Sequence, residues 1–221
     1  MHQNIEHISF LSYGIYMRNY IKPTIEIYSK LGSKYVKSIK DGTPEEIYQF
    51  VDVLPKNGKI LDVGCAGGRD SKILISKGLR VVGIDLCDSF LKIAKKNVPQ
   101  AIFLKKDLLN LNFKPGSFDG IWAQAVLLYV KKSEMPQVLK YFRSILKDRG
   151  LLFIGLKQGS GEKNITDKLS TKNERYFVFY QKQEIEQLVK KAGFQIIFSK
   201  ICSDNVGREN LKWIFILASK N

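Results

Sequence analysis

The sequence predicts an α/β domain in which a largely parallel sheet is covered by helices on both faces, with a helical segment in front of it. From Lys59 onward, short apolar runs alternate with amphipathic segments, the pattern of parallel strands joined by helices. The first run, 59–63, leads directly into a glycine-rich turn, Gly64 to Gly68, and a helix then begins near Asp70. A strand, a glycine turn and a helix start form a nucleotide-binding corner, because the helix N-terminus offers free N–H groups.

The segment 1–54 is predicted to be a helical lid, and 55–221 a single compact domain. Tyrosines recur at helical spacing as far as Tyr20, where Lys22-Pro23 interrupts the run. A second helix is expected over 25–31 with Thr24 as its cap. A third is expected after Thr43, since a threonine followed by proline and two acids is typical of a helix start.

The later elements are predicted from apolar runs, turn residues and helical periodicity. We expect strands at 59–63, 80–85, 101–105, 118–123, 150–156, 194–201 and 212–219, and helices at 70–77, 88–96, 134–147 and 184–192. The segment 157–164 is polar and rich in glycine, which predicts a mobile loop. The segment 175–180 is expected to be a short strand or extended turn.

Composition limits the class of protein. A chain of 221 residues with 44% apolar residues is long enough for one domain with a full core. We find no apolar run of the roughly 18 residues that a membrane span needs, so we expect a cytoplasmic protein that does not enter a membrane. The cysteines, Cys65, Cys87 and Cys202, are too few and too irregularly spaced for a disulfide framework or a zinc site, so no metal is expected.

The net charge of +15 raises the question of a nucleic-acid partner. The chain has 29 lysines and 7 arginines, and the lysines are spread along its whole length. Such a distribution is typical of a compositional bias, so the charge favours RNA binding only as an alternative.

Two acids at strand ends suggest what the corner binds. Asp85 ends the second strand about twenty residues after the glycines, where an acid accepts hydrogen bonds from ribose hydroxyls. The turn lacks the G-x-G-x-x-G fingerprint of dinucleotide enzymes, because Ala66 and Arg69 replace its second and third glycines. Asp62, inside the first strand, would repel a pyrophosphate but suits a ligand that carries an amino group. An NAD-dependent oxidoreductase is therefore disfavoured.

The spacing of Asp62, Gly64 and Gly68 resembles the first motif of class I S-adenosylmethionine (SAM) dependent methyltransferases of the type 11/25-like group. The opening of the fourth strand, Phe118-Asp119-Gly120-Ile121, is also similar to that family, and Ala66 departs from its usual glycine. The resemblance covers about 45–221. It implies a Rossmann-like seven-stranded sheet whose last strand inserts antiparallel between the fifth and sixth.

The resemblance further implies SAM as the cofactor and S-adenosylhomocysteine (SAH) as its product. It places the methionine end beside Asp62, Gly64, Cys65, Ala66 and Gly68, the ribose beside Asp85 and Leu86, the adenine beside Asp107 and Leu108, and the sulfonium near Ala123. It also places Tyr28 and Tyr35 against the cofactor. Arg69 is expected either to reach the cofactor's carboxylate or to face solvent. The lid and the loop 157–174 are expected to close together, with Gly159 and Gly161 as hinge.

The acceptor side is less defined. The chain's two histidines, His2 and His7, lie far from the predicted pocket, so a histidine base is not expected. Candidate catalytic groups are Tyr129, Tyr176 and Tyr180, and candidate substrate-binding groups are Tyr129, Lys157, Arg175 and Tyr176.

Three functions remain open. We favour methyl transfer to oxygen or nitrogen of a small molecule. The stretch 173–180 resembles tRNA methyltransferases that modify wobble uridines, although Val178 or Phe179 stands where that subgroup has a histidine. The third alternative is a non-catalytic partner subunit with the same fold. The sequence does not predict the oligomeric state.

Overall fold

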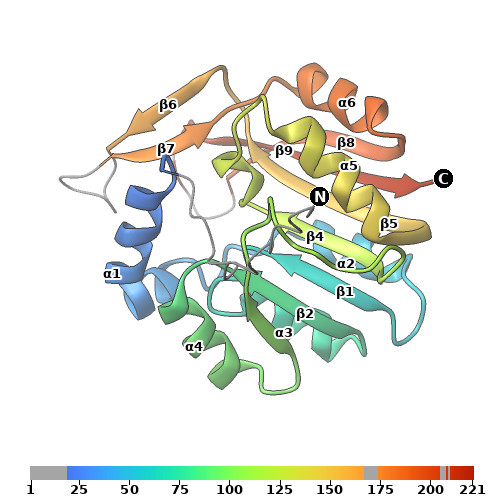
Figure 1. Ribbon diagram of the computed structural model, residues 1–221, viewed down its shortest axis with the longest axis horizontal. Coiled ribbons are helices and arrows are strands. Elements are labelled where there is room, and N and C mark those ends of the chain that lie inside the picture. Colours follow the sequence, from blue (N-terminus) through green and yellow to red (C-terminus); the bar gives the residue numbers. More distant parts are fainter. Residues whose placement is uncertain (1–18, 167–173, 205–207, 209) are drawn as a thin grey trace, which may run out of the picture.

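The computed structural model describes residues 19–166, 174–204, 208 and 210–221. A seven-stranded sheet in the order β3-β2-β1-β4-β5-β9-β8 forms its centre (Figure 1). The strands are β1 (Lys59–Val63), β2 (Arg80–Asp85), β3 (Ile102–Lys105), β4 (Phe118–Gln124), β5 (Leu146–Lys157), β8 (Phe194–Ser203) and β9 (Lys212–Lys220). The strands β1 to β5 pair in parallel, and β9 pairs antiparallel with both β5 and β8. The predicted sheet, with its last strand antiparallel between the fifth and sixth of the main sheet, is confirmed.

The strand order reverses between β1 and β4, because β2 and β3 lie on one side of β1 while β4 and β5 lie on the other. Such a switch point opens a crevice at the carboxyl ends of the strands, where ligands bind in open α/β sheets. The strand β1 is apolar at nearly every position because both faces of the sheet are covered, and Ile60, Leu61 and Val63 are buried.

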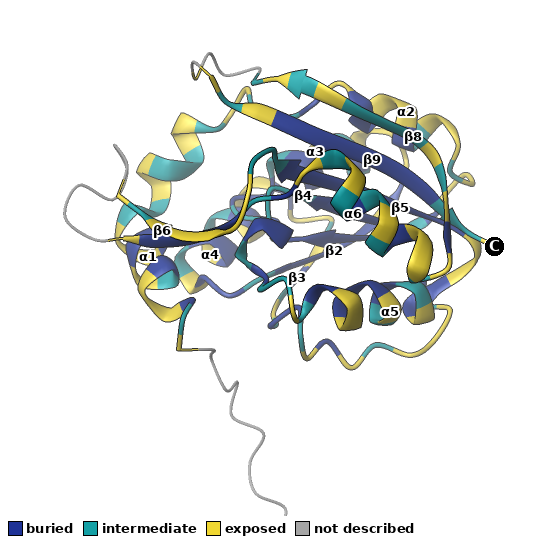
Figure 2. Cartoon of the chain, turned by 90° about the horizontal axis from the view of Figure 1, so that it is seen from above, coloured by how far each residue is buried: buried dark blue, intermediate teal, exposed yellow. Residues whose placement is uncertain are grey.

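Helices surround the sheet: α1 (Lys22–Ser38), α2 (Glu46–Asp52), α3 (Arg69–Ser76), α4 (Asp88–Asn97), the 3₁₀ turn η1 (Leu127–Tyr129), α5 (Met135–Ile145) and α6 (Lys182–Lys191). Figure 2 shows the buried residues concentrated on the strands, while the helices are buried on one side and exposed on the other. The predicted helices of the domain correspond to α3, α4, α5 and α6. Among the described residues, no helix has the length and apolarity to cross a membrane.

The N-terminal segment differs from the expectation in three places. The helix α1 is longer than predicted, begins at Lys22 with Pro23 in its first turn, and is kinked at Gly32. Thr24 does not cap it; its hydroxyl instead accepts a hydrogen bond of 3.2 Å from the backbone N–H of Tyr176. Thr43 is not the N-cap of the next helix, since Glu45 holds that position before α2, and the Thr43 hydroxyl donates to Asp70. Most of the helix expected before Tyr20 lies outside the described residues.

The predicted loop 157–164 instead contributes a strand. β6 (Glu162–Ile165) pairs antiparallel with β7 (Arg175–Val178) in a separate two-stranded sheet. The sequence hides β6 because the strand is exposed and lacks apolar alternation, whereas β7 is buried throughout. In Figure 1 this hairpin lies next to α1, at the end of the molecule where α1 also packs on α4.

The start of β5 and the placement of α2 also differ from the prediction. The strand β5 begins four residues before the predicted 150–156, and its Leu146 pairs with Phe118 across an irregular register. The helix α2, placed within the predicted lid, packs Ile47 and Phe50 into the main core. This helix is thus part of the body of the domain.

Candidate functional site

Two adjoining cavities lie at the carboxyl ends of the central strands. The larger, of about 450 Å³, reaches from β1 and β4 towards β7 and β9, and the smaller, of about 90 Å³, continues to β2. Both are lined by Tyr28, Tyr35, Gly64, Ala66, Ala125 and Tyr129. Since ligand pockets have volumes of about 300–1,000 Å³, the combined space is of the right size for a cofactor with a small acceptor.

The glycine turn forms the floor where the two cavities meet. Gly64 has φ of 71°, and a Cβ added there would lie 2.6 Å from the side chain of Val126. A Cβ on Gly67 would lie 2.5 Å from Val36 of α1, so this helix packs directly on the turn. Ala66 has φ of 44°, a conformation that glycine adopts more readily. The left-handed backbone explains why a glycine is usual at this position of the motif.

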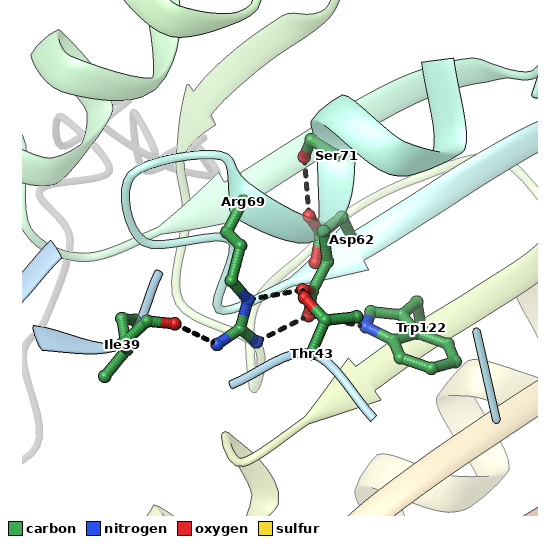
Figure 3. A network of polar contacts seen from close by, with 7 residues as sticks. Ile39, Thr43, Asp62, Arg69, Ser71 and Trp122 are labelled. Carbon is green, nitrogen blue, oxygen red and sulfur yellow. Dashed lines mark hydrogen bonds and ion pairs between the residues drawn. The ribbon is translucent and has the colours of Figure 1, made fainter. Parts of the chain in front are cut away.

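Asp62 is buried beside the turn and lines the larger cavity. Its Oδ2 accepts a hydrogen bond of 2.5 Å from the Ser71 hydroxyl in the first turn of α3 (Figure 3). Burial, reinforced by the neighbouring charge of Asp70, raises the pKa of Asp62 to about 7. A cationic group beside this carboxyl would restore its charge at neutral pH.

Asp70 accepts hydrogen bonds from three side chains that Figure 3 labels, Thr43, Arg69 and Trp122. Its carboxylate accepts hydrogen bonds from the Thr43 hydroxyl at 2.5 Å and the Trp122 indole at 2.9 Å. The Arg69 guanidinium adds two, at 2.6 and 3.0 Å, and donates a third to the carbonyl of Ile39. Burial raises the pKa of Asp70, but the charge and hydrogen bonds of Arg69 outweigh burial and hold it below the usual value.

This network decides between the two expectations for Arg69. The side chain lines the cavity and does not face solvent freely, but its guanidinium is engaged by Asp70 and by the end of α1. The structure therefore uses Arg69 to fasten the N-terminal segment to the glycine turn.

Asp85 lies at the end of β2 and lines the smaller cavity. Its two oxygens accept hydrogen bonds from the backbone N–H groups of Ala66, at 3.0 Å, and Cys87, at 2.8 Å. Burial raises the pKa of Asp85 to about 6 despite these hydrogen bonds. Because a carboxylate has about four lone-pair sites, Asp85 retains capacity for further donors. Leu86 and Leu108 line the same cavity, as expected.

Aromatic residues of α1 cover the cavities. Tyr28 and Tyr35 have ring centroids 4.7 Å apart, and both rings lie near Phe90 of α4. The hydroxyl of Tyr28 shares a hydrogen bond with the hydroxyl of Tyr129 and accepts another, of 2.5 Å, from Arg175. Burial, then the proximity of Tyr129, raises the pKa of Tyr28 well above its usual value. Burial also raises the pKa of Tyr35 well above its usual value, so Tyr28 and Tyr35 are hydrogen-bonding groups and not phenolate bases at neutral pH.

The far wall of the larger cavity contains Lys157 and Arg175, both among the expected substrate-binding residues. The Lys157 ammonium lies 4.0 Å and the Arg175 guanidinium 4.9 Å from the centroid of Phe177. Arg208 and Leu211, between β8 and β9, and Trp213 of β9 complete this wall.

Several expected site residues do not line these cavities. Gly68, whose φ is 81°, ends the turn and packs on α4; Ala123 is enclosed within β4; and Asp107 accepts a hydrogen bond of 3.0 Å from the N–H of Leu109. The Tyr176 hydroxyl is bonded to Glu162 on the opposite side of β7, and Tyr180 is buried in the core. Cys65 does line the larger cavity, and burial raises the pKa of its thiol well above the usual value.

Further lining residues come from two sources. Gln124 ends β4 and Ala125 and Val126 follow it, in the segment that the family resemblance predicts to run past the methyl-donor end of the pocket. Phe177, Arg208 and Trp213 reach the cavity only through the hairpin and the β8–β9 region, which leave no local signal in the sequence. Within the described residues, no cluster of His, Cys, Asp and Glu is arranged to hold a metal ion.

Comparison with known proteins finds similarity to methyltransferases. A family model described as a methyltransferase domain matches residues 61–154. The provisionally named methyltransferase YqeM of Bacillus subtilis is 30% identical over 132 residues, which are 57% of this chain and 53% of YqeM. The ubiquinone biosynthesis O-methyltransferase of Pelagibacter ubique is 33% identical over 109 residues, 45% of this chain and 42% of that protein. The matched regions thus span about half of each relative.

Solved structures agree on the fold. A SAM-dependent methyltransferase of Methanosarcina mazei superimposes with a TM-score of 0.71 at 22% identity, over 80% of this chain and 98% of that chain. The 1,6-didemethyltoxoflavin-N1-methyltransferase of Burkholderia thailandensis, solved with SAH, gives a TM-score of 0.66 at 18% identity, over 93% of this chain and 92% of that chain. The domain match, the relatives and the sheet with its antiparallel last strand agree: residues 61–154 match a methyltransferase domain, and the chain has the fold of SAM-dependent methyltransferases.

Proposed function

We propose that the protein transfers the methyl group of SAM to an oxygen or nitrogen of a small-molecule acceptor. The observation that carries this proposal is a pair of acids, the buried Asp62 and the half-buried Asp85, on adjacent parallel strands, where each lines one of two adjoining cavities. Burial raises the pKa of both carboxyls, so each gains from a ligand that offers hydrogen-bond donors or a positive charge.

The residues present fit SAM. Asp62 would accept hydrogen bonds from the ammonium of its methionine part. Gly64 lines the cavity with backbone alone, because the space that a Cβ would take is occupied by Val126. Asp85 would accept from the ribose hydroxyls, while Leu86 and Leu108 offer apolar surface to the adenine. When bound, SAM supplies a methyl group activated by the adjacent sulfonium.

The chain's own contribution is binding, orientation and exclusion of water. Tyr28 and Tyr35 of α1 cover the cavity, and Tyr129 lies where its two parts meet. No residue is assigned as a general base, because methyl transfer needs one only when the acceptor must lose a proton before it attacks. Tyr129 is the one expected catalytic tyrosine that lines the cavity, and we assign it to positioning the acceptor.

A specific observation keeps a tRNA acceptor as second candidate. The helices α1 and α4 contact each other beside the site, and both expose lysines. These are Lys30, Lys34 and Lys37 on α1 and Lys92, Lys95 and Lys96 on α4. A basic strip of this kind is suited to phosphate contacts.

The test is binding followed by transfer. Calorimetry should show SAM and SAH binding to the purified protein, and labelled methyl groups from SAM should enter a metabolite extract and not a total tRNA pool. Absence of binding by both SAM and SAH would refute the methyltransferase assignment. Label in the tRNA pool alone would replace the small molecule by RNA.

A further inference from the structure

The wall of the larger cavity opposite Asp62 pairs cationic groups with aromatic rings. Lys157 and Arg175 both lie over Phe177, with their charged groups 4.0 and 4.9 Å from the ring centroid. Further along the wall, the Arg208 guanidinium lies 5.8 Å from the centroid of Trp213. All these side chains line the same cavity.

These groups are held in place by other residues. Arg175 is only 3% exposed and donates a hydrogen bond of 2.5 Å to Tyr28. Asp204 accepts hydrogen bonds from the Arg208 guanidinium, at 2.5 and 3.1 Å, and one of 2.8 Å from the Trp213 indole. A ligand at this wall therefore meets a surface whose geometry is fixed before binding, which lowers the entropic cost of binding.

Charge is distributed unevenly along the cavity. The acids that line it, Asp62 and Asp70, both lie at the glycine turn, and Asp70 is matched there by Arg69. Among the described residues, the wall at Lys157 and Arg175 carries cationic groups and no acid. The turn suits the cofactor's ammonium, whereas the cationic groups of this wall suit an anion. A planar guanidinium in particular matches the two oxygens of a carboxylate.

The same wall also offers apolar surface. Leu128, Leu211 and Trp213 line the cavity next to the cationic groups. We infer that the acceptor is a small carboxylic acid with a flat, apolar body, whose acid group is bound by Lys157 and Arg175. This inference rests on the proposed methyl transfer and names the class of acceptor for that same site. Lys157 and Arg175 are specificity-determining residues in this arrangement, because they distinguish an acid from its neutral counterpart.

A matched pair of probes tests the inference. The compounds are 4-hydroxybenzoate and 4-hydroxybenzamide, which have nearly the same shape but differ in charge. Binding of each to the SAH-saturated protein is measured by ligand-observed NMR, for the wild type and for Lys157→Met, Lys157→Arg and Arg175→Lys. Lys190→Met, an exposed lysine on α6, is the matched control. Affinity for SAH is measured for every variant.

We expect the acid to bind and the amide to bind at least about tenfold more weakly. Lys157→Met should lose this preference, Lys157→Arg should keep it, and Lys190→Met should match the wild type. SAH affinity should change less than about twofold in all of them.

Equal binding of acid and amide, or no binding of the acid, would overturn the inference. A loss of SAH affinity in Lys157→Met with acid binding intact would also overturn it, because the lysine would then serve the cofactor's own carboxylate. These outcomes are separate from failure of the proposed function, which would appear as absence of SAH binding to the wild type.

Discussion

Arg175 of β7 donates a hydrogen bond of 2.5 Å to the hydroxyl of Tyr28 on α1, joining two residues 147 positions apart. The same phenol is hydrogen-bonded to Tyr129, so one side chain connects the N-terminal helix, the hairpin and the turn η1 that follows β4. The contact ties the covering helix to the wall of the cavity. It is the physical basis for treating α1 as a lid.

The lid should respond to cofactor. We expect backbone hydrogen exchange in α1 and in the segment 157–178 to slow together when SAH is added, because a bound cofactor would fill the space beneath Tyr28 and Tyr35. Exchange that is the same with and without SAH would make α1 a fixed packing element. Part of the predicted lid and loop, 1–18 and 167–173, lies outside the described residues, and exchange mass spectrometry covers these as well.

Removing the Tyr28 hydroxyl tests the contact itself. Tyr28→Phe removes the hydrogen bonds that the phenol hydroxyl makes with Arg175 and Tyr129, and a lost buried hydrogen bond typically costs about 1–3 kcal/mol. Chemical denaturation should show a loss in this range. Tyr48→Phe, on the exposed side of α2, should leave the free energy of unfolding unchanged. A loss of similar size in both variants would mean that the Tyr28 hydroxyl has no special role.

Asp85→Ala should weaken the binding of both SAM and SAH. The ribose hydroxyls would lose a charged acceptor, a loss of about 1.5–3 kcal/mol or roughly 10- to 150-fold in Kd. Asp88→Ala, which removes an exposed acid three residues later, serves as control for calorimetry. Unchanged SAH affinity in Asp85→Ala would remove Asp85 from the cofactor site.

Asp62 should make the protein without cofactor less stable as pH rises. Its pKa is raised to about 7 in the folded chain, against about 3.9 for a free aspartate. Between these values the folded state binds more protons than the unfolded state, so stability falls as pH increases. Asp85, with its pKa raised to about 6, acts in the same direction. Thermal unfolding at pH 5 and pH 8 should show this decline, and Asp62→Asn should reduce it.

Asp62→Asn, which should reduce the loss of stability at high pH, should weaken the binding of SAH. Ionised Asp62 pairs with the cofactor's ammonium, so SAH affinity of the wild type should rise from about pH 6 to about pH 8. Asp62→Asn should bind SAH more weakly and lose this pH dependence. A variant that is both less stable at pH 8 and unchanged in SAH affinity would contradict this role of Asp62.

Asp70 should matter more for stability than Thr43, one of its hydrogen-bond donors. Asp70→Ala leaves the Arg69 charge and the Trp122 indole without their acceptor, and breaking a buried ion pair from one side costs about 3–5 kcal/mol. Thr43→Val removes a single hydrogen bond and should cost about 1 kcal/mol. Denaturation curves in which the two variants lose equal stability would show that the network does not act through Asp70.

The salt dependence of tRNA binding distinguishes a tRNA acceptor from a small-molecule acceptor. A protein that contacts 6–10 phosphates loses about 10³–10⁵ in affinity between 50 and 200 mM salt. We expect negligible binding of bulk tRNA even at low salt, with the lysines of α1 and α4 acting as solvated surface. Tight binding with a steep salt dependence, reduced by replacing Lys30, Lys34 and Lys37 with glutamine, would favour the RNA acceptor.

The parts of the fold that follow local rules were predictable. The strand β1, the glycine turn and Asp85 stand in consecutive sequence, and the spacing alone placed them at one corner of the sheet. The helix α6 was also visible, and it ends before Gly193, whose φ of 89° is the left-handed conformation expected after a helix.

The parts of the fold that depend on residues distant in the sequence could not be predicted. Thr43 looks like a helix cap, but a buried carboxylate 27 positions away takes its hydroxyl. Glu162 begins a strand only because Val178 pairs with it across the hairpin. Arg69 looked like a ligand for a carboxylate in the cofactor, and the structure supplies Asp70 in its place. In each case the competing partner cannot be read from neighbouring residues.

The position of β9 has a consequence for synthesis of the chain. This strand comes last in sequence but lies between β5 and β8, so β8 has no neighbour in the sheet until β9 has formed. During translation the apolar edge of β5 therefore emerges from the ribosome well before its permanent partner. An unpaired edge of this kind invites pairing with other chains, which makes the nascent protein a natural client for a chaperone that shields this seam.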